Sequence, residues 1–245
     1  MIASITNTQT PAISYHRYSN AFKMPSPELK LSPASESDIP RLATISTSAF
    51  STHDAAFRIV WGNTPPGAHD SAITHLLIPT HSSTRCTMKV EIDGQIAGFA
   101  LWYLPASAAD ESGNKNLDLR SDPKDVETSG WNPPEGMNME FFMQKITCFG
   151  EAKKRDYVKG RDMMLDLCFV DPVYQNRGVG KRLLEWGMQK ADEMGVDIWL
   201  VSTPDAKGFY ERAGWETKEE AAMDLGKFGE SGEYVRRWMV RKPVR

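Results

Sequence analysis

Polar and apolar positions alternate along residues 87–92, and residues 95–102 form a second, largely apolar run of similar length. Between the two runs stands Asp93-Gly94, a favoured two-residue turn because both residues tolerate the left-handed backbone that such a turn requires. The pattern predicts a β-hairpin over residues 87–102.

A second informative pattern lies in the last third of the chain. Met163–Val170 is an apolar run interrupted only by Asp166, which is typical of a buried strand. Apolar residues then recur at helical spacing over Lys181–Met194, and Ile198–Ser202 is a further apolar strand. A short helix is predicted over Pro204–Ala213. This strand–helix–strand–helix order predicts an α/β fold in which the two strands run parallel.

The N-terminal segment differs in composition from the rest of the chain. It is rich in Ser, Thr, Asn and Pro and carries no acidic residue before Glu28. We expect a disordered arm over 1–28, with a weak organellar presequence as the alternative interpretation. Residues 29–245 are predicted to form one domain. Within this domain, residues 105–160 form an insertion between strands, in which a polar stretch precedes a short amphipathic helix over 137–149.

Composition and charge exclude two classes of protein. The 245 residues contain 29 Lys and Arg against 32 Asp and Glu, a formal charge of −3, which argues against a nucleic-acid-binding protein. The apolar runs are far shorter than the roughly 20 residues that cross a bilayer, so no membrane span is predicted. With 40% hydrophobic and 25% charged residues, the chain has the composition of an ordinary globular protein.

Cysteine and histidine spacing gives no sign of a metal centre. Cys86, Cys148 and Cys168 are widely separated, and the five histidines form no H-E-x-x-H motif. We therefore predict neither a metal site nor a disulfide framework. Unpaired cysteines fit a reducing intracellular compartment, so we expect a cytoplasmic protein.

Two glycines, Gly178 and Gly180, stand where the strand at 163–170 gives way to the following helix. Glycines there allow a tight turn and let a ligand approach the peptide groups. The first N–H groups of a helix have no partner within it, and the helix dipole favours negative charge at that end. Lys181 and Arg182 add cationic side chains. The turn therefore predicts a phosphate or pyrophosphate site.

The two common nucleotide motifs do not fit this turn. The pattern G-x-x-x-x-G-K-[ST] requires glycine where Gln175 stands and Ser or Thr in place of Arg182. The dinucleotide pattern G-x-G-x-x-G requires a third glycine in place of Leu183. A glycine turn that serves geometry alone remains the simpler alternative.

The segment Gln175-Asn176-Arg177-Gly178-Val179-Gly180 resembles the Q/R-x-x-G-x-G/A signature of the GNAT acyltransferases. The segment 208–215, which reads GFYERAGW, is similar to the x-x-L-Y-x-x-x-G-F element of the same family. In detail, the sequence of these segments looks most like that of the fungal small-molecule branch. The match is strong over 163–217 and weaker at 29–50 and 86–103. The resemblance implies a mixed, centrally splayed sheet flanked by helices, in a single domain.

The resemblance also implies acetyl-CoA, or another acyl-CoA, as co-substrate. Its pyrophosphate would lie on backbone N–H groups of Arg177–Lys181, and its pantetheine arm would pair with the strand edge at Cys168–Val170. Many relatives carry Asn after the second strand, where this chain has Ser202-Thr203. The residues that the resemblance assigns to the cofactor are Cys168, Phe169, Val170, Gln175, Asn176, Arg177, Gly178, Val179, Gly180, Lys181, Arg182 and Thr203.

Two residues are the candidates for catalysis. Tyr210 matches the family tyrosine that is proposed to protonate the departing thiolate, and packing or orienting the sulfur is its alternative role. Asp166, the only charge in an apolar strand, is the candidate base. Two other roles for Asp166, a structural ion pair with an Arg or an anchor for the substrate ammonium, are together as open as the role of base. Glu91 and His53 are weaker candidates, and some family members use no dedicated base.

These observations predict an acetyl-CoA-dependent N-acetyltransferase that acts directly on the primary amine of a small molecule. A protein or peptide amine acetyltransferase is the first alternative. An open groove with an acidic rim would favour that alternative, whereas an enclosed aromatic pocket would favour a small metabolite. A non-catalytic CoA-binding module is the second alternative, and O-acetylation is also open because the signature reports the donor only.

Overall fold

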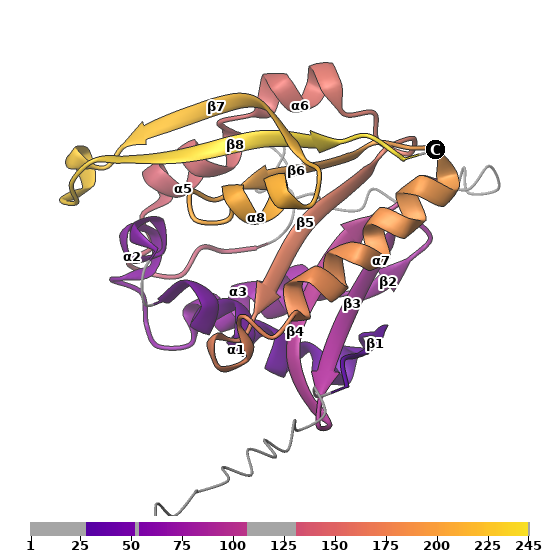
Figure 1. Ribbon diagram of the computed structural model, residues 1–245. Coiled ribbons are helices and arrows are strands. Elements are labelled where there is room, and N and C mark those ends of the chain that lie inside the picture. The colour runs from indigo at the N-terminus through magenta and orange to yellow at the C-terminus, as the bar shows by residue number, and fades with distance from the viewer. Residues whose placement is uncertain (1–27, 52–53, 107–130, 245) are drawn as a thin grey trace, which may run out of the picture.

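The computed structural model describes residues 28–51, 54–106 and 131–244, and its strands form one mixed sheet (Figure 1). The strands are β1 (Lys30–Pro33), β2 (His81–Ser82), β3 (Arg85–Ile92), β4 (Gln95–Tyr103), β5 (Met163–Val170), β6 (Ile198–Ser202), β7 (Glu216–Asp224) and β8 (Glu233–Arg241). The helices are α1 (Ile39–Ser51), α2 (Ala55–Trp61), α3 (Ala68–Leu77), α5 (Met139–Thr147), α6 (Gly150–Asp156), α7 (Val179–Met194) and α8 (Lys207–Arg212), with 3-10 turns η1 (Glu36–Asp38), η2 (Pro172–Tyr174) and η3 (Gly226–Phe228). The strand order is β1-β3-β4-β5-β6-β8-β7, with β2 paired to β3, which confirms the predicted mixed α/β fold.

The predicted hairpin is confirmed as β3 and β4. The two strands pair antiparallel, with Lys89 opposite Phe99. At the turn, Asp93 has φ 51° and Gly94 has φ 75°, so both residues take up the left-handed conformation that a tight two-residue turn needs.

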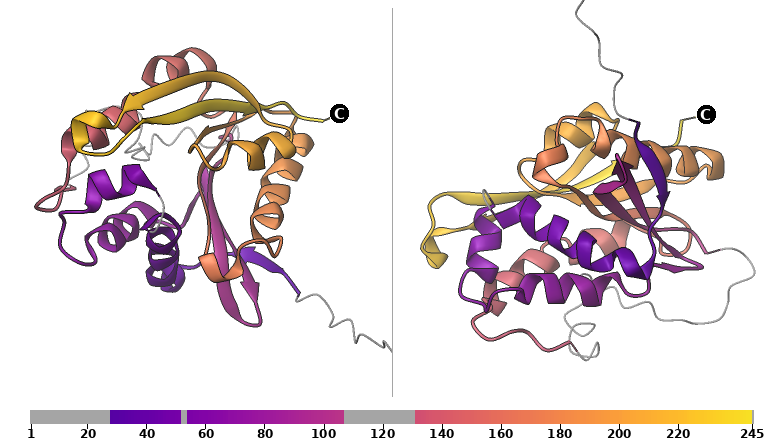
Figure 2. Two further views of the ribbon diagram at one scale, coloured as in Figure 1. Left: turned by 60° about the vertical axis from the view of Figure 1, so that its left-hand side comes forward. Right: turned by 90° about the horizontal axis from the view of Figure 1, so that it is seen from below.

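Helices cover both faces of the sheet, with α7 on one side and α1 and α3 on the other (Figure 2). Along β4, Ala100 and Trp102 pack in the core shared with α7. Phe99 and Leu101 pack in the core shared with α1 and α3. Successive side chains of a strand point to opposite faces, and both faces of β4 are buried here. This explains why the strand reads as a continuous apolar run.

The helix α7 lies unusually close to the sheet at one point. A Cβ atom added to Gly187 would lie 2.3 Å from the ring of Trp102, which is itself completely buried. Only glycine therefore lets α7 pack on this tryptophan at the observed distance. The contact fixes the height of α7 above β4.

The strands β5 and β6 run parallel but pair only along their first residues. Their pairing ends with Leu165 opposite Leu200. Beyond that point β5 stays paired with β4 as far as Val170, and β6 stays paired with β8 as far as Ser202. Because different neighbours hold the two strands, they separate toward their carboxyl ends. The predicted parallel pair and the central splay are both confirmed.

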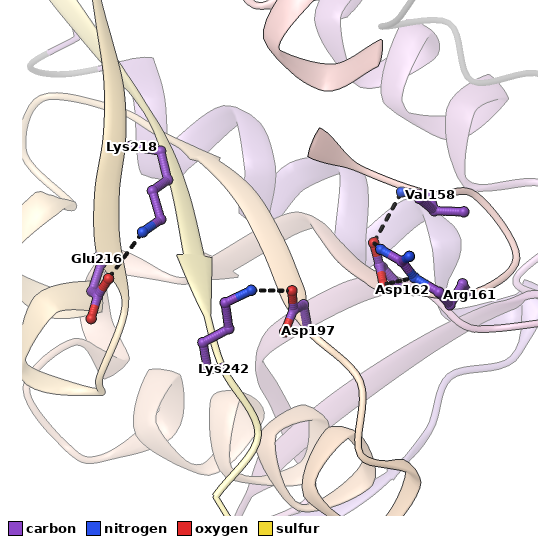
Figure 3. A network of polar contacts seen from close by, with 7 residues as sticks. All are labelled: Val158, Arg161, Asp162, Asp197, Glu216, Lys218 and Lys242. Atoms are coloured by element: carbon purple, nitrogen blue, oxygen red, sulfur yellow. Dashed lines mark hydrogen bonds and ion pairs between the residues drawn. The ribbon is translucent and has the colours of Figure 1, made fainter. Parts of the chain in front are cut away.

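A polar network anchors the paired ends of β5 and β6 (Figure 3). Asp162 is only 2% exposed and accepts hydrogen bonds from the Val158 backbone N–H at 2.9 Å and from the Arg161 guanidinium at 2.8 and 2.9 Å. Lys242, after β8, pairs with Asp197 just before β6. A buried carboxylate is tolerated where charge-assisted hydrogen bonds satisfy it. One end of the strand pair is therefore pinned while the other end opens.

The described part of the insertion at 105–160 is more helical than predicted. The helix expected over 137–149 is present as α5, and α6 follows it directly. Trp238 of β8 donates its indole N–H to Asp156 at 3.0 Å, which attaches the end of α6 to the sheet. Residues 107–130 of the insertion and the proposed arm at 1–28, except Glu28, lie outside the described residues.

None of the helices in the described part of the chain combines the length and the hydrophobicity that crossing a membrane requires. In the same described residues, no group of three or more His, Cys, Asp or Glu side chains is arranged to hold a metal ion. All three cysteines carry free thiols.

Candidate functional site

A cavity of about 700 Å³ opens where β5 and β6 separate. One wall is formed by β5 and by the turn into α7. The opposite wall comes from the end of β6 and from α8. A further part of the lining comes from the helices α1, α2, α3, α5 and α6. The splay of the sheet therefore creates one cavity with a strand edge and a helix N-terminus in its wall. We call the part lined by the helices α1, α2, α3, α5 and α6 and by Arg236 and Trp238 of β8 the chamber.

The strand β5 carries an irregularity at Asp166. On β4, Leu101 pairs with Leu167 and the adjacent Trp102 pairs with Leu165, so Asp166 is an extra residue in β5. Such a bulge shifts the phase of the strand and redirects its side chains. Leu165 accordingly packs on the α7 side of the sheet and Leu167 on the α1 side. Asp166 lies in the cavity wall.

The N-terminus of α7 forms another part of the wall. Gly178 is the N-cap and has φ 86°, a left-handed conformation that favours glycine. A Cβ atom on Gly180 would lie 3.1 Å from the ring of Phe209 on α8, so the turn passes close to that helix. Lys181 lies beside it in the lining. Exposed backbone N–H groups, a helix dipole and a cation together fit a pyrophosphate.

Most residues that the sequence assigned to the site meet in this one cavity. Arg177 and Arg182 are the exceptions, because neither belongs to its lining. The Arg177 guanidinium instead lies over the ring of Tyr174, 5.6 Å from its centre, and Arg182 approaches Glu185 at 3.9 Å. The sequence-assigned residues that line the cavity are Asp166, Cys168, Phe169, Val170, Gln175, Asn176, Gly178, Val179, Gly180, Lys181, Thr203 and Tyr210.

Tyr210 of α8 lies in the cavity wall with 9% of its surface exposed. Burial, together with the nearby Cys168 thiol, raises the pKa of the Tyr210 phenol well above its usual range. Burial likewise raises the pKa of the Cys168 thiol to about 12. Both groups therefore keep their protons at neutral pH, so the phenol is a proton donor there and the thiol is a poor nucleophile.

Comparison with known families identifies the fold and its chemistry. Residues 50–215, more than half of the chain, match the model of the acetyltransferase (GNAT) family. The chain belongs to the GNAT acetyltransferase family. It is accordingly an acyltransferase that uses acetyl-CoA. Of the residues in the cavity wall, those on β5 and at the start of α7 fall within the matched segment.

Solved structures support the same fold for this GNAT acetyltransferase. A mosquito arylalkylamine N-acetyltransferase (like 5b) has a TM-score of 0.55 at 13% identity, covering 88% of this chain and 100% of its own. A Corynebacterium glutamicum protein described as histone acetyltransferase HPA2 and related acetyltransferase has a TM-score of 0.54 at 17% identity, covering 89% and 97%. The Escherichia coli ribosomal-protein-S18-alanine N-acetyltransferase has a TM-score of 0.50 at 13% identity, covering 89% and 96%. A comparison with curated protein sequences gives no match.

The helical chamber of the cavity contains residues that the sequence analysis did not single out. Its wall is rich in aromatic rings and carries a few charged groups. These residues lie far apart in the sequence, on α1, α2, α3, α5 and β8 and in adjoining loops, so no local pattern marks them. The aromatic members of this lining are Phe50, Trp61, Trp131, Phe142, Phe149 and Trp238, and the ionisable members include Asp54, His69, Lys145 and Arg236.

Contacts between α2 and the β7–β8 hairpin lie beside the chamber at Asp54, which belongs to the lining. Tyr234 donates its hydroxyl proton to Asp54 at 2.8 Å, and Arg58 pairs with Glu230 at 2.9 Å. Around them, Val60 of α2 shares an apolar cluster with residues of α5 and of the hairpin. These contacts join segments far apart in the sequence and hold Asp54 against the hairpin.

The weaker base candidates lie elsewhere. Glu91 of β3 pairs with Lys89 at 3.3 Å and with Lys30 at 3.9 Å, and it is not part of the cavity lining. His53 lies outside the described residues.

Proposed function

We propose that this acetyltransferase transfers an acetyl group to the primary amine of a small molecule with an apolar or aromatic body. The observation that carries the proposal is the chamber of the cavity, with Phe50, Trp61 and Phe142 in its wall. The aromatic lining favours a small acceptor with an apolar body, because pockets for small molecules are lined mainly by hydrophobic and aromatic side chains. At 13–17% identity, the solved structures carry no information about the acceptor.

The cofactor site is proposed on the residues that the sequence assigned. Backbone N–H groups at the start of α7 would hold the pyrophosphate, with Lys181 and the side chains of Gln175 and Asn176 nearby. The edge of β5 over Cys168–Val170 has no partner strand on its β6 side among the described residues, so it can pair with the pantetheine arm. Thr203 lies in the opposite wall and offers a hydroxyl as donor or acceptor.

The proposed reaction is a direct transfer. The amine nitrogen attacks the thioester carbonyl, and a backbone N–H near Val170 stabilises the resulting oxyanion. When the C–S bond breaks, the Tyr210 phenol gives its proton to the CoA sulfur. The amide nitrogen loses a proton, and the phenolate is reprotonated. Asp166, in the cavity wall beside the bulge, is proposed to attract the acceptor ammonium or to accept its proton.

Two finer proposals rest on the sequence. The sequence of residues 175–180 and 208–215 supports membership of the fungal small-molecule branch. A family-wide alignment would test this membership. Three free thiols support a cytoplasmic location, which a fluorescent fusion protein imaged in cells would test.

The test of the proposed function is calorimetric titration of the full chain with acetyl-CoA, followed by thiol release against a panel of amines. Acetyl-CoA binding with thiol release that is faster for aromatic amines than for methylamine is the expected result. Thiol release only with an alcohol, or only with peptides, would show that the acceptor is an alcohol or a peptide and not a small amine. Binding without release from any acceptor would favour the non-catalytic module, and no binding would overturn the cofactor site.

A further inference from the structure

Arg236 of β8 places a positive charge in the wall of the chamber. Alternate residues of a strand point to the same face of the sheet, so Arg236 shares a face with Tyr234 and Trp238. On that face Tyr234 bonds to Asp54 at the start of α2, and Trp238 bonds to Asp156 at the end of α6. The strand therefore directs Arg236 toward the helices that line the chamber.

One arm of the Arg236 guanidinium is held by α5. Its Nη1 donates a hydrogen bond to the backbone carbonyl of Lys145 at 2.5 Å and a longer one to the Cys148 sulfur at 3.9 Å. Lys145 lies in the last turn of α5, where carbonyl groups lack a partner within the helix and the helix dipole is negative. Arg236 therefore stabilises the end of α5, and this contact fixes the position of its guanidinium.

Most of the guanidinium has no partner in the described part of the chain. A guanidinium carries five N–H donors, yet only Nη1 makes hydrogen bonds there. Nε is buried without a hydrogen-bond partner, and Arg236 forms no ion pair with any described carboxylate. Asp54, the acid of the chamber, instead accepts from Tyr234 at 2.8 Å and from the Phe57 backbone N–H at 2.7 Å. A part-buried cation without a counter-ion is costly, and an anion that enters the chamber would offset this cost.

The remaining charges of the cavity wall strengthen this positive character. The described ionisable side chains of the chamber are Lys145, Lys153 and Arg236 on the basic side, Asp54 on the acidic side, and His69. The rest of the described cavity wall is balanced, with Lys181 and Arg212 against Asp166 and Asp205. Within the described residues, cations therefore outnumber acids in the chamber alone, which favours a ligand with a negative group at that end of the cavity.

An acceptor that carries its own carboxylate fits this arrangement. We propose that Arg236 binds a carboxylate of the acceptor, so that the acceptors are primary amines with an aromatic or apolar body and a carboxylate. The planar guanidinium matches the geometry of a carboxylate, and hydrogen bonds between the two ions are stronger than those between neutral groups. This assignment rests on the proposed function and narrows its acceptor class. Arg236 is a specificity residue in it and forms no bond to the reacting atoms.

Thiol release with pairs of aromatic amines that differ only by one carboxylate tests the assignment. Benzylamine and its para-carboxylate place the charge far from the amine, whereas phenethylamine and phenylalanine place it next to the amine. In wild type, kcat/KM should be about 10- to 100-fold higher for the carboxylated member of at least one pair, mainly through a lower KM. No preference for the carboxylated amine in either pair would overturn the assignment.

Replacing Arg236 by Gln should remove this preference, because kcat/KM falls for the carboxylated amine and stays nearly unchanged for its parent amine. The preference is a ratio measured on one protein, so a general loss of folded enzyme cancels from it. Arg236→Lys keeps the charge without the planar fork and should keep part of the preference. Arg237→Gln is the matched control, because the neighbouring Arg237 pairs with Glu220 at 2.6 Å and lies outside the cavity lining. Equal losses for both amines in Arg236→Gln would leave Arg236 only its contact with α5 and overturn the assignment.

A second measurement does not depend on turnover. Hydrocinnamate has the ring and the carboxylate of phenylalanine without the amine, and hydrocinnamamide is its uncharged counterpart. In calorimetric titrations of the full chain with saturating CoA, wild type should bind the acid more tightly than the amide, and Arg236→Gln should bind the two alike. Equal affinities in wild type would overturn the assignment. Wild-type protein that releases no thiol with any amine would overturn the proposed function, whereas release without a carboxylate preference would overturn only this assignment.

Discussion

The Cys168 thiol of β5 and the Tyr210 phenol of α8 lie close enough together that the thiol raises the pKa of the phenol. Both groups also lie in the wall of the cavity where the sheet opens. Each group therefore stays protonated at neutral pH, because ionisation would place a negative charge in a buried environment. A phenol that keeps its proton until a thiolate forms beside it is suited to act as an acid in the last step of acyl transfer.

Replacing Tyr210 by Phe should lower kcat by about 100-fold and leave acetyl-CoA affinity nearly unchanged. Because the phenol remains protonated far above neutral pH, the loss should be the same between about pH 6 and about pH 9. Rates measured across this range with a good acceptor test the prediction. Tyr157→Phe, outside the cavity lining, is the matched control. Equal rates for wild type and Tyr210→Phe would rule out the acid role.

Replacing Gly180 by Glu should weaken acetyl-CoA binding by about 100-fold or more. The new carboxylate would face the proposed pyrophosphate at a helix N-terminus, and its Cβ would press on Phe209 at 3.1 Å. Calorimetric titration measures the effect. Gln189→Glu, which adds the same charge on an exposed position of the same helix, should bind acetyl-CoA normally. A folded Gly180→Glu protein with wild-type affinity would contradict the cofactor site.

Several elements of the fold follow from local sequence signals. A stereochemical reason underlies each of three signals: the Asp93-Gly94 turn, the helical spacing of apolar residues after Gly180 and the glycine at 195. In the structure Gly195 has φ 68° and ends α7, as a helix-terminating glycine should. The residues proposed to bind the cofactor could be named from the sequence because most of them occupy one short, contiguous stretch, and the structure places most of them in one cavity.

The chamber proposed to hold the acceptor could not be predicted, because long-range packing creates it. His69 enters the cavity wall through ring contacts with α2 and a hydrogen bond from α1, and neither leaves a local pattern. The bulge at Asp166 is similarly hidden, since a buried strand reads as an apolar run whatever its phase. Arg182 shows a different limit of sequence-based prediction. The motif predicts a cation at the turn, but in the structure the Arg182 side chain approaches Glu185.

Replacing Gly187 by Ala should destabilise the fold by about 1–3 kcal/mol. The added methyl group would lie 2.3 Å from the buried ring of Trp102, so α7 or the tryptophan must shift. Urea denaturation measures the loss. Gly150→Ala on α6 is the control, because nothing lies within 4 Å of its added Cβ. Equal stability of the two variants would show that α7 can move away from the sheet at no cost.

Alkaline pH should destabilise the protein partly through Cys168. Burial raises the pKa of this thiol from the ordinary 9.0 to about 12 in the folded chain. Below about pH 9 the thiol is protonated in both states, and its contribution to stability is complete. Above that pH the unfolded chain releases the proton and the folded chain does not, so unfolding becomes progressively more favourable until the folded thiol also ionises.

The corresponding measurement is the free energy of unfolding in urea at a series of pH values from about 8 to about 11. The Cys168→Ala variant should be less stable than wild type at the lower end, because it loses buried volume. Its stability should then fall less steeply with pH, so the two curves converge. Cys86, with its pKa raised to about 11, and Tyr234 contribute to both curves alike and cancel in the difference. Parallel curves would mean that the Cys168 thiol ionises in the folded protein as readily as in the unfolded chain.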